Sequence, residues 1–189
     1  MLNYKLKVLL ILLFSWLIAG CASVKMDSIA TVKQVDLPRF MGDWYVIAAI
    51  PTAIETQSYN AIENYKLEQD GTIATTFTFY KGAFDGPLKT YKPRGFVVKE
   101  SGNALWGMQF IWPIKAEYRI AYLDDNYQQT VIARNARDYV WIMARTPQIE
   151  DAKYTELVQL VKDMGYDTAK LRKVPQSWTG VNSGMKKAE

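Results

Sequence analysis

The chain has 189 residues, of which 49% are hydrophobic, 13% aromatic and 22% charged, with a formal net charge of +4. This length suits one domain with a substantial core, and the aromatic content argues against a disordered chain. Histidine is absent and the single cysteine is Cys21. The composition therefore excludes histidine-dependent catalysis, histidine-coordinated metals, intrachain disulfides and thiolate metal clusters. No uninterrupted apolar run reaches 18 residues, which excludes a polytopic membrane protein.

Residues 1–20 have the pattern of a secretory signal. Lys5 and Lys7 lie in a segment without acids, and the apolar segment that follows, residues 8–18, is too short to span a bilayer. Removal of this signal would lower the formal charge from +4 to +2. The basic character therefore belongs partly to the signal, and no nucleic-acid partner is expected.

The sequence LIAGC at residues 17–21 closely resembles a bacterial lipobox. The resemblance implies cleavage after Gly20, attachment of lipid to the sulfur of Cys21 and acylation of the new amino terminus. Ala22 and Ser23 follow, where an Asp would imply retention in the inner membrane. The protein is therefore expected to be lipid-anchored in the outer membrane and to face the periplasm. The alternative is an ordinary signal peptide with a chance cysteine.

The next part of the chain, from residue 43 to residue 145, alternates between strand-forming segments and turn signals. The segments are rich in β-branched and aromatic residues, and the turns include the Asp-Gly pair at residues 70–71. Eight strands at hairpin spacing favour an antiparallel up-and-down barrel or a sandwich. The predicted strands are residues 44–50, 59–67, 72–80, 90–99, 104–111, 118–123, 129–133 and 139–144.

The hydrophobic period becomes helical after Pro147. Acids at residues 150–151 favour a helix start, and Gly165 favours a stop. The pattern predicts one amphipathic helix packed against the outside of the strands, followed by a short strand at residues 170–174. The predicted apolar stripe of the helix consists of Tyr154, Leu157, Val158, Val161 and Met164.

Three segments form a set of motifs. Residues 40–45, FMGDWY, contain a G-x-W motif at the first predicted strand, and residues 139–147, YVWIMARTP, place an arginine after the last one. Residues 123–127, LDDNY, keep the acid and tyrosine of a Thr-Asp-Tyr motif but lack the threonine. With the helix that follows, this set resembles the lipocalin family, in its bacterial outer-membrane lipoprotein branch, over residues 36–178.

The resemblance implies an all-β fold, an eight-stranded antiparallel up-and-down barrel (a calyx) with one C-terminal α-helix packed on its outside. It implies that Trp44 closes one end of the barrel, and that Arg145 stacks on its indole and donates to nearby carbonyls. The structural motif residues would be Gly42, Trp44, Asp125, Tyr127 and Arg145. The expected organisation is a signal at residues 1–20, a lipidated N-terminus and tether at 21–35, the lipocalin domain at 36–178 and a tail at 179–189.

The interior of an eight-stranded barrel holds either packed side chains or one small ligand. The family resemblance implies a lipid ligand, such as a fatty acid or lysophospholipid, for storage, transport or membrane maintenance, with no cofactor and no metal. Lys81, Lys89, Lys92 and Arg94 are candidates for pairing with an acidic headgroup. The residues predicted to contact the ligand are Tyr65, Phe77, Phe79, Met108, Phe110, Tyr139 and Trp141.

Two other interpretations stay open. The protein could be a scaffold lipoprotein whose barrel is filled by its own aromatic residues, which a ligand titration would distinguish. An enzyme would have to work without histidine, and the acids offer no pair: Asp124 and Asp125 are adjacent in a predicted turn, whereas Glu63, Glu68 and Glu117 are isolated and expected to point outward. A non-enzymatic binding protein is therefore predicted, and the sequence leaves homodimer formation open.

Overall fold

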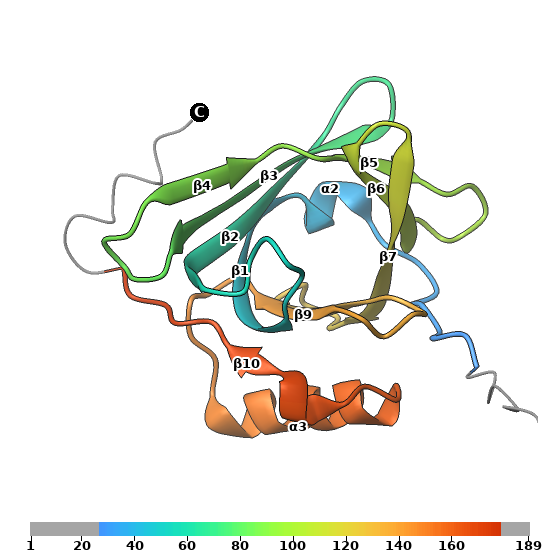
Figure 1. The fold of residues 1–189 in the computed structure, drawn as a ribbon. Coiled ribbons are helices and arrows are strands. Elements are labelled where there is room, and N and C mark those ends of the chain that lie inside the picture. Colours follow the sequence, from blue (N-terminus) through green and yellow to red (C-terminus); the bar gives the residue numbers. More distant parts are fainter. Residues whose placement is uncertain (1–26, 179–189) are drawn as a thin grey trace, which may run out of the picture.

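The computed structural model describes residues 27–178, so the predicted signal, Cys21 and the predicted C-terminal tail lie outside the described residues. The described chain forms one antiparallel sheet that closes into a barrel, with an α-helix against its outside (Figure 1). Closure comes from pairing of the first strand with the last, for example Tyr45 with Ala144 and Ile50 with Val140. The strands are β1 (Gly42–Ile50), β2 (Ser58–Leu67), β3 (Thr72–Lys81), β4 (Leu88–Tyr91), β5 (Arg94–Val97), β6 (Leu105–Ile111), β7 (Ile114–Leu123), β8 (Gln129–Ala133) and β9 (Val140–Ala144).

The predicted eight-stranded antiparallel barrel is confirmed, with a change at the fourth strand. The predicted strand at residues 90–99 is two strands, β4 and β5, which both pair with β3 and together form one wall of the barrel. Lys92 and Pro93 interrupt it, because proline has no N–H to donate to a ladder. The Pro93 carbonyl still accepts a hydrogen bond from the Thr75 N–H at 3.1 Å. Strand β7 begins at Ile114, four residues before the predicted start.

Two hydrophobic clusters share the strands. The inner cluster fills part of the barrel, and the outer cluster lies between the barrel and the helix. Strand β1 serves both, because alternate residues face opposite sides: Trp44 and Val46 point inward, whereas Tyr45 and Ile47 point outward. The strand is therefore buried on both faces for most of its length.

The predicted outer helix is α3 (Asp151–Asp163), and it buries Leu157 and Val161 of the predicted stripe. It ends before Gly165, whose φ of +87° is costly for other residues. A 3₁₀ turn, η1 (Thr168–Lys170), leads to β10 (Arg172–Lys173), which pairs with the second half of β1 (Figure 1). No helix within residues 27–178 is long and apolar enough to cross a membrane.

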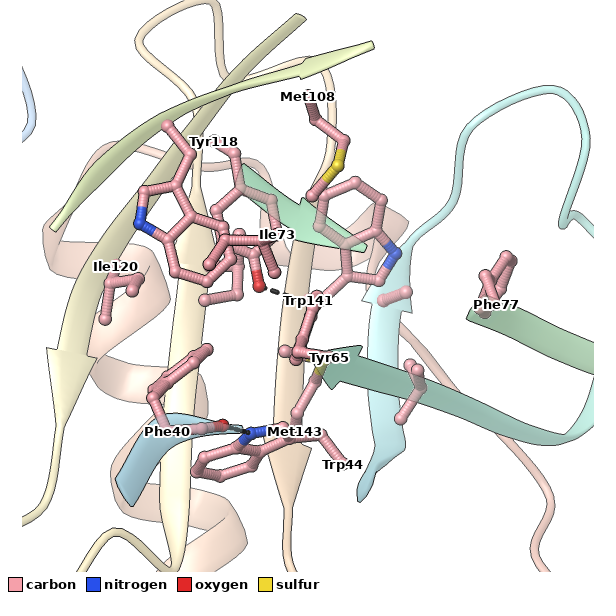
Figure 2. Packing of buried hydrophobic residues seen from close by; sticks show 14 of the residues in the cluster. Phe40, Trp44, Tyr65, Ile73, Phe77, Met108, Tyr118, Ile120, Trp141 and Met143 are labelled. Atoms are coloured by element: carbon pink, nitrogen blue, oxygen red, sulfur yellow. Dashed lines mark hydrogen bonds between the residues drawn. The ribbon is translucent and has the colours of Figure 1, made fainter. Parts of the chain in front are cut away.

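A short helix, α2 (Leu37–Phe40), precedes β1 and plugs one end of the barrel. Phe40 and Trp44 are fully buried there, and the Trp44 indole N–H donates to the Phe40 carbonyl at 2.8 Å (Figure 2). Trp106 packs edge-on against Phe40 with a ring-centroid separation of 5.6 Å. We call this the closed end, and the opposite end, reached by the β1–β2 and β6–β7 connections, the open end.

Candidate ligand-binding cavity

A cavity of about 430 Å³ occupies the open half of the barrel. Its volume lies in the range of small-molecule sites, and its wall is largely apolar and aromatic, as in such sites. The polar groups of the lining are few: Thr52, Glu55, Glu63, Thr75, Lys92 and Glu117. The remaining lining residues are Ala53, Ile54, Phe77, Tyr91, Pro93, Met108, Phe110, Ile111, Ala116, Tyr118, Tyr139 and Trp141.

Five of the seven residues predicted to contact a ligand lie on this wall: Phe77, Met108, Phe110, Tyr139 and Trp141. The other two lie behind it. Tyr65 is buried in the inner cluster toward the closed end. Phe79 packs behind the wall against Phe77 and Tyr91, with ring centroids 5.2 and 6.1 Å away. The aromatic residues therefore divide between the wall and the packing that supports it.

The four candidate cations are not gathered at one place. Lys92 lines the cavity and is exposed, because it lies in the break between β4 and β5. Arg94 is directed away, with its guanidinium donating to Thr72 Oγ1 at 2.9 Å and pairing with Asp70 at 3.5 Å. Lys81 and Lys89 are not among the lining residues.

Glu63 corrects the sequence interpretation, because it points into the barrel instead of outward. Its exposure is 6%, and it shares the inward face of β2 with Ala61 and Tyr65. The Tyr65 hydroxyl donates to Glu63 Oε2 and lies 2.6 Å from the Tyr118 hydroxyl. The signal was available in the sequence: Glu63 lies two residues from Tyr65, which was predicted to face inward, and period-two alternation puts both on one face.

The environment of Glu63 favours its protonated form. Burial is the main cause, and the nearby carboxylate of Glu55 adds to it, whereas the hydrogen bond from Tyr65 acts in the opposite direction. Together these effects raise the pKa of Glu63 to about 7. The inner wall of the cavity thus holds a group whose charge changes near neutral pH.

Glu55 is a second buried carboxylate, and sequence reasoning missed it because it lies in a loop. The β1–β2 connection folds over the cavity, and Glu55 is only 4% exposed. Its Oε1 accepts hydrogen bonds from the Thr52 N–H at 2.9 Å and the Thr52 hydroxyl at 3.0 Å, and its Oε2 accepts one from the Trp141 indole N–H at 3.1 Å. Burial raises the pKa of Glu55, although these hydrogen bonds oppose the shift. The carboxylate therefore fastens the loop to β9.

Comparison with known proteins assigns the family. Residues 35–176 match the lipocalin-like domain. The chain belongs to the lipocalin family. Temperature-induced lipocalin-1 of Arabidopsis thaliana is 32% identical over 160 residues, which cover 78% of this chain and 83% of the relative. Outer membrane lipoprotein Blc of Vibrio cholerae is 24% identical over 90% of this lipocalin and 99% of the relative. The prediction of a lipocalin related to bacterial outer-membrane lipoproteins is confirmed.

Solved structures show the same fold at low sequence identity. Apocrustacyanin C2 superposes with a TM-score of 0.63 at 13% identity, covering 79% of this lipocalin and 84% of that chain. Insecticyanin from the tobacco hornworm Manduca sexta gives a TM-score of 0.62 at 17% identity, covering 80% and 86%. Both comparisons support the barrel with one outer helix.

The G-x-W motif and the arginine meet at the closed end of the lipocalin barrel. The Arg145 guanidinium lies 3.9 Å from the centroid of the Trp44 ring. Its Nη1 donates to the Asp43 carbonyl at 2.8 Å, and its Nη2 donates to the carbonyls of Arg39 and Phe40 at 2.8 and 3.1 Å. The planar guanidinium of Arg145 thus connects α2 and β1 to the end of β9.

The remaining motif residues join the same network. Tyr127 takes a φ of +59°, and its carbonyl accepts from Arg145 Nε at 3.3 Å. Its hydroxyl accepts a hydrogen bond from the Asp36 N–H at 2.9 Å. The Arg39 guanidinium stacks on its ring, 4.0 Å from the ring centroid. The Asp125 carbonyl accepts from Arg39 Nη2 at 3.0 Å. The G-x-W glycine, which precedes Asp43, has a φ of +89°, a region that favours glycine.

Proposed function

We propose that this lipocalin binds one small apolar or amphiphilic molecule, such as a fatty acid or lysophospholipid, inside its barrel. The observation that carries the proposal is the cavity of about 430 Å³, whose wall includes Phe77, Met108, Tyr139 and Trp141. An open apolar cavity gains free energy when a hydrocarbon chain leaves water to fill it. Storage, transport or membrane maintenance is the role that follows from such binding.

The cavity also weighs against the other interpretations. A scaffold lipoprotein with a barrel filled by its own side chains would leave no such space, whereas here only the closed half is filled. Lipocalins are in general ligand-binding, non-enzymatic proteins. Each of the two buried acids accepts a hydrogen bond that supports the fold. Glu55 accepts from Thr52 within the β1–β2 loop, and Glu63 accepts from the Tyr65 hydroxyl. We therefore infer binding without catalysis.

The proposed location is the outer membrane, with the barrel tethered through lipid on Cys21 and facing the periplasm. Blc relatives of this lipocalin are named outer membrane lipoproteins. The first described residue, Asp27, accepts a hydrogen bond through its carbonyl from Arg137 in the β8–β9 connection at the open end. The chain between Cys21 and Asp27 can span at most about 20 Å. Such a tether would hold the open end near the lipid surface.

The rim of the open end supports the same orientation. The β6–β7 hairpin exposes a run of large apolar side chains: Phe110 is 47% exposed, Ile111 72%, Trp112 82% and Ile114 68%. Large exposed apolar groups of this kind mark surfaces that meet membranes or partners. Phe110 and Ile111 also line the cavity, so a ligand could pass between the bilayer and the barrel along this rim.

The test is a fluorescence titration of residues 22–189, delipidated and checked for fold by circular dichroism, with a fatty acid and with a lysophospholipid. We expect saturable quenching with one site per chain, because Trp141 lines the cavity. Trp141→Phe should lose most of the signal. Trp178→Phe is the matched control, because Trp178 packs against Tyr45 on the outer face of the barrel. A flat titration by a folded barrel would refute the proposal and favour the scaffold.

A further inference from the structure

The wall of the cavity carries one carboxylate oxygen that the fold does not satisfy. Glu63 Oε2 is bonded to the Tyr65 hydroxyl, but Oε1 accepts no hydrogen bond from the residues that the structure describes. The side chain is 94% removed from solvent and still lines the cavity, since its exposure is 6%. Among the described residues every fully buried side-chain nitrogen or oxygen has a hydrogen-bond partner, so Oε1 is the oxygen that Glu63 leaves open to the cavity. A ligand that brings a donor to Oε1 would give this oxygen a hydrogen-bond partner inside the cavity.

The charges around Glu63 restrict what the donor can be. The titratable groups that face it are Tyr65 on its own strand, Tyr118 on β7 and Glu55 on the β1–β2 loop, and none of them is a cation. The one basic residue of the described cavity lining is Lys92, which lies exposed in the wall between β4 and β5. The inner part of the cavity is therefore acidic, and it would repel a ligand carboxylate or phosphate.

We propose that the inner part of this cavity recognises a protonated amine, so that the barrel prefers an apolar chain ending in an ammonium group, with that group bound to the Glu63 carboxylate. This inference rests on the proposed function and specifies the ligand class. Ammonium has donors but no acceptor, which matches an oxygen that lacks a donor, and it supplies the missing countercharge. The chain then lies against Met108, Phe77 and Trp141 on its way to the mouth.

The same geometry fixes how a fatty acid can lie. Its carboxylate would meet two buried acids at the inner wall, so its methyl end must point inward and its carboxylate toward Lys92. An amine can instead be inserted with its charged end first. The pKa of Glu63 in the ligand-free protein is about 7. The affinity for the amine should therefore rise as the pH increases through that value, until the amine itself loses its proton.

The experiment compares three eight-carbon ligands that differ only in the headgroup: octylamine, octan-1-ol and octanoate. Binding to the full chain, purified from membranes and held in lipid nanodiscs, is measured calorimetrically, with empty nanodiscs subtracted. At about pH 8 we expect octylamine to bind about tenfold more tightly than octanol, with octanoate weakest. At about pH 5.5, where Glu63 is protonated, the advantage of the amine should fall to about threefold or less.

Two variants assign the effect. Glu63→Gln should remove the preference for the amine and its pH dependence but keep octanol binding, which also shows that the variant is folded. Glu68→Gln makes the same change outside the cavity, in the β2–β3 turn, and should behave as the wild type. Octanoate binding as tightly as octylamine, or an amine preference that survives Glu63→Gln, overturns the inference alone. No binding of any of the three ligands overturns the proposed function as well.

Discussion

Trp44 and Trp141 are both almost fully buried inside the barrel, yet their surroundings differ. The Trp44 indole donates to the main-chain carbonyl of Phe40, and its face is covered by a guanidinium. The Trp141 indole donates to a carboxylate on a loop, and the residue lines a cavity. At the closed end side chains fill the barrel, whereas at the open end they leave a cavity. Stability is therefore expected to depend on the closed end and ligand binding on the open end.

The largest effect is expected at Arg145. Arg145→Ala removes the stacking on Trp44 and donors to several carbonyls, and we expect a loss of about 4 kcal/mol in the free energy of unfolding. Arg145→Lys keeps the charge but not the planar fork and should lose about 2 kcal/mol. Urea denaturation measures both values. Ligand affinity of the folded variants should stay near that of the wild type. A loss of ligand affinity without a loss of stability would contradict the assignment of stability to the closed end and of ligand binding to the open end.

The second effect is a pH dependence that arises at the open end. Folding raises the pKa of Glu63 from 4.5 to about 7, so the folded state binds the proton more tightly than the unfolded state. The stabilisation is fully present below about pH 4.5 and is lost as the pH rises to about 7, a change of roughly 3 kcal/mol. Urea denaturation at several pH values should show this decline in the ligand-free protein. Glu63→Gln should flatten the decline, and a curve unchanged by it would place the titrating group elsewhere.

The smallest effect on stability is expected from filling the cavity. Ala116 lines the cavity on β7. Ala116→Trp places a large ring in empty space, so the free energy of unfolding should change by less than about 1 kcal/mol. Fatty-acid affinity should fall by about tenfold or more, because ring and ligand compete for the same volume. Calorimetry and urea denaturation on the same samples test both parts. Unchanged affinity would show that the ligand lies outside this cavity.

The closed end was readable from the sequence because it depends on local motifs. The G-x-W segment and Arg145 are each recognisable from a few neighbours, and the structure brings them together as the family resemblance implies. In β3, Phe77 and Phe79 were predicted to contact a ligand inside the barrel, and both lie in the inner cluster. Where a strand is regular and its inward side chains are apolar, hydrophobic pattern and burial agree.

The open end was harder to predict because two of its acidic side chains are buried and one of them lies in a loop. A charged residue in a strand is ordinarily assigned to the solvent face, so Glu63 was predicted to point outward although its alternation with Tyr65 indicates the inward face. Glu55 lies in a loop, where no periodicity indicates burial. Its burial depends on Trp141, a residue 86 positions away in the chain. No pattern in the sequence predicts a contact between residues so far apart in the chain.

The position of α3 divides the barrel wall into a side that is buried on both faces and a side whose outer face is more exposed. On the side of β1, β8 and β9, side chains are buried on both faces, so any displacement of these strands would disrupt two cores at once. On the side of β4, β5 and β6 the outer side chains are more exposed, and Lys92 and Pro93 interrupt the wall. A ligand bulkier than the cavity would therefore widen the mouth on that side, away from the helix.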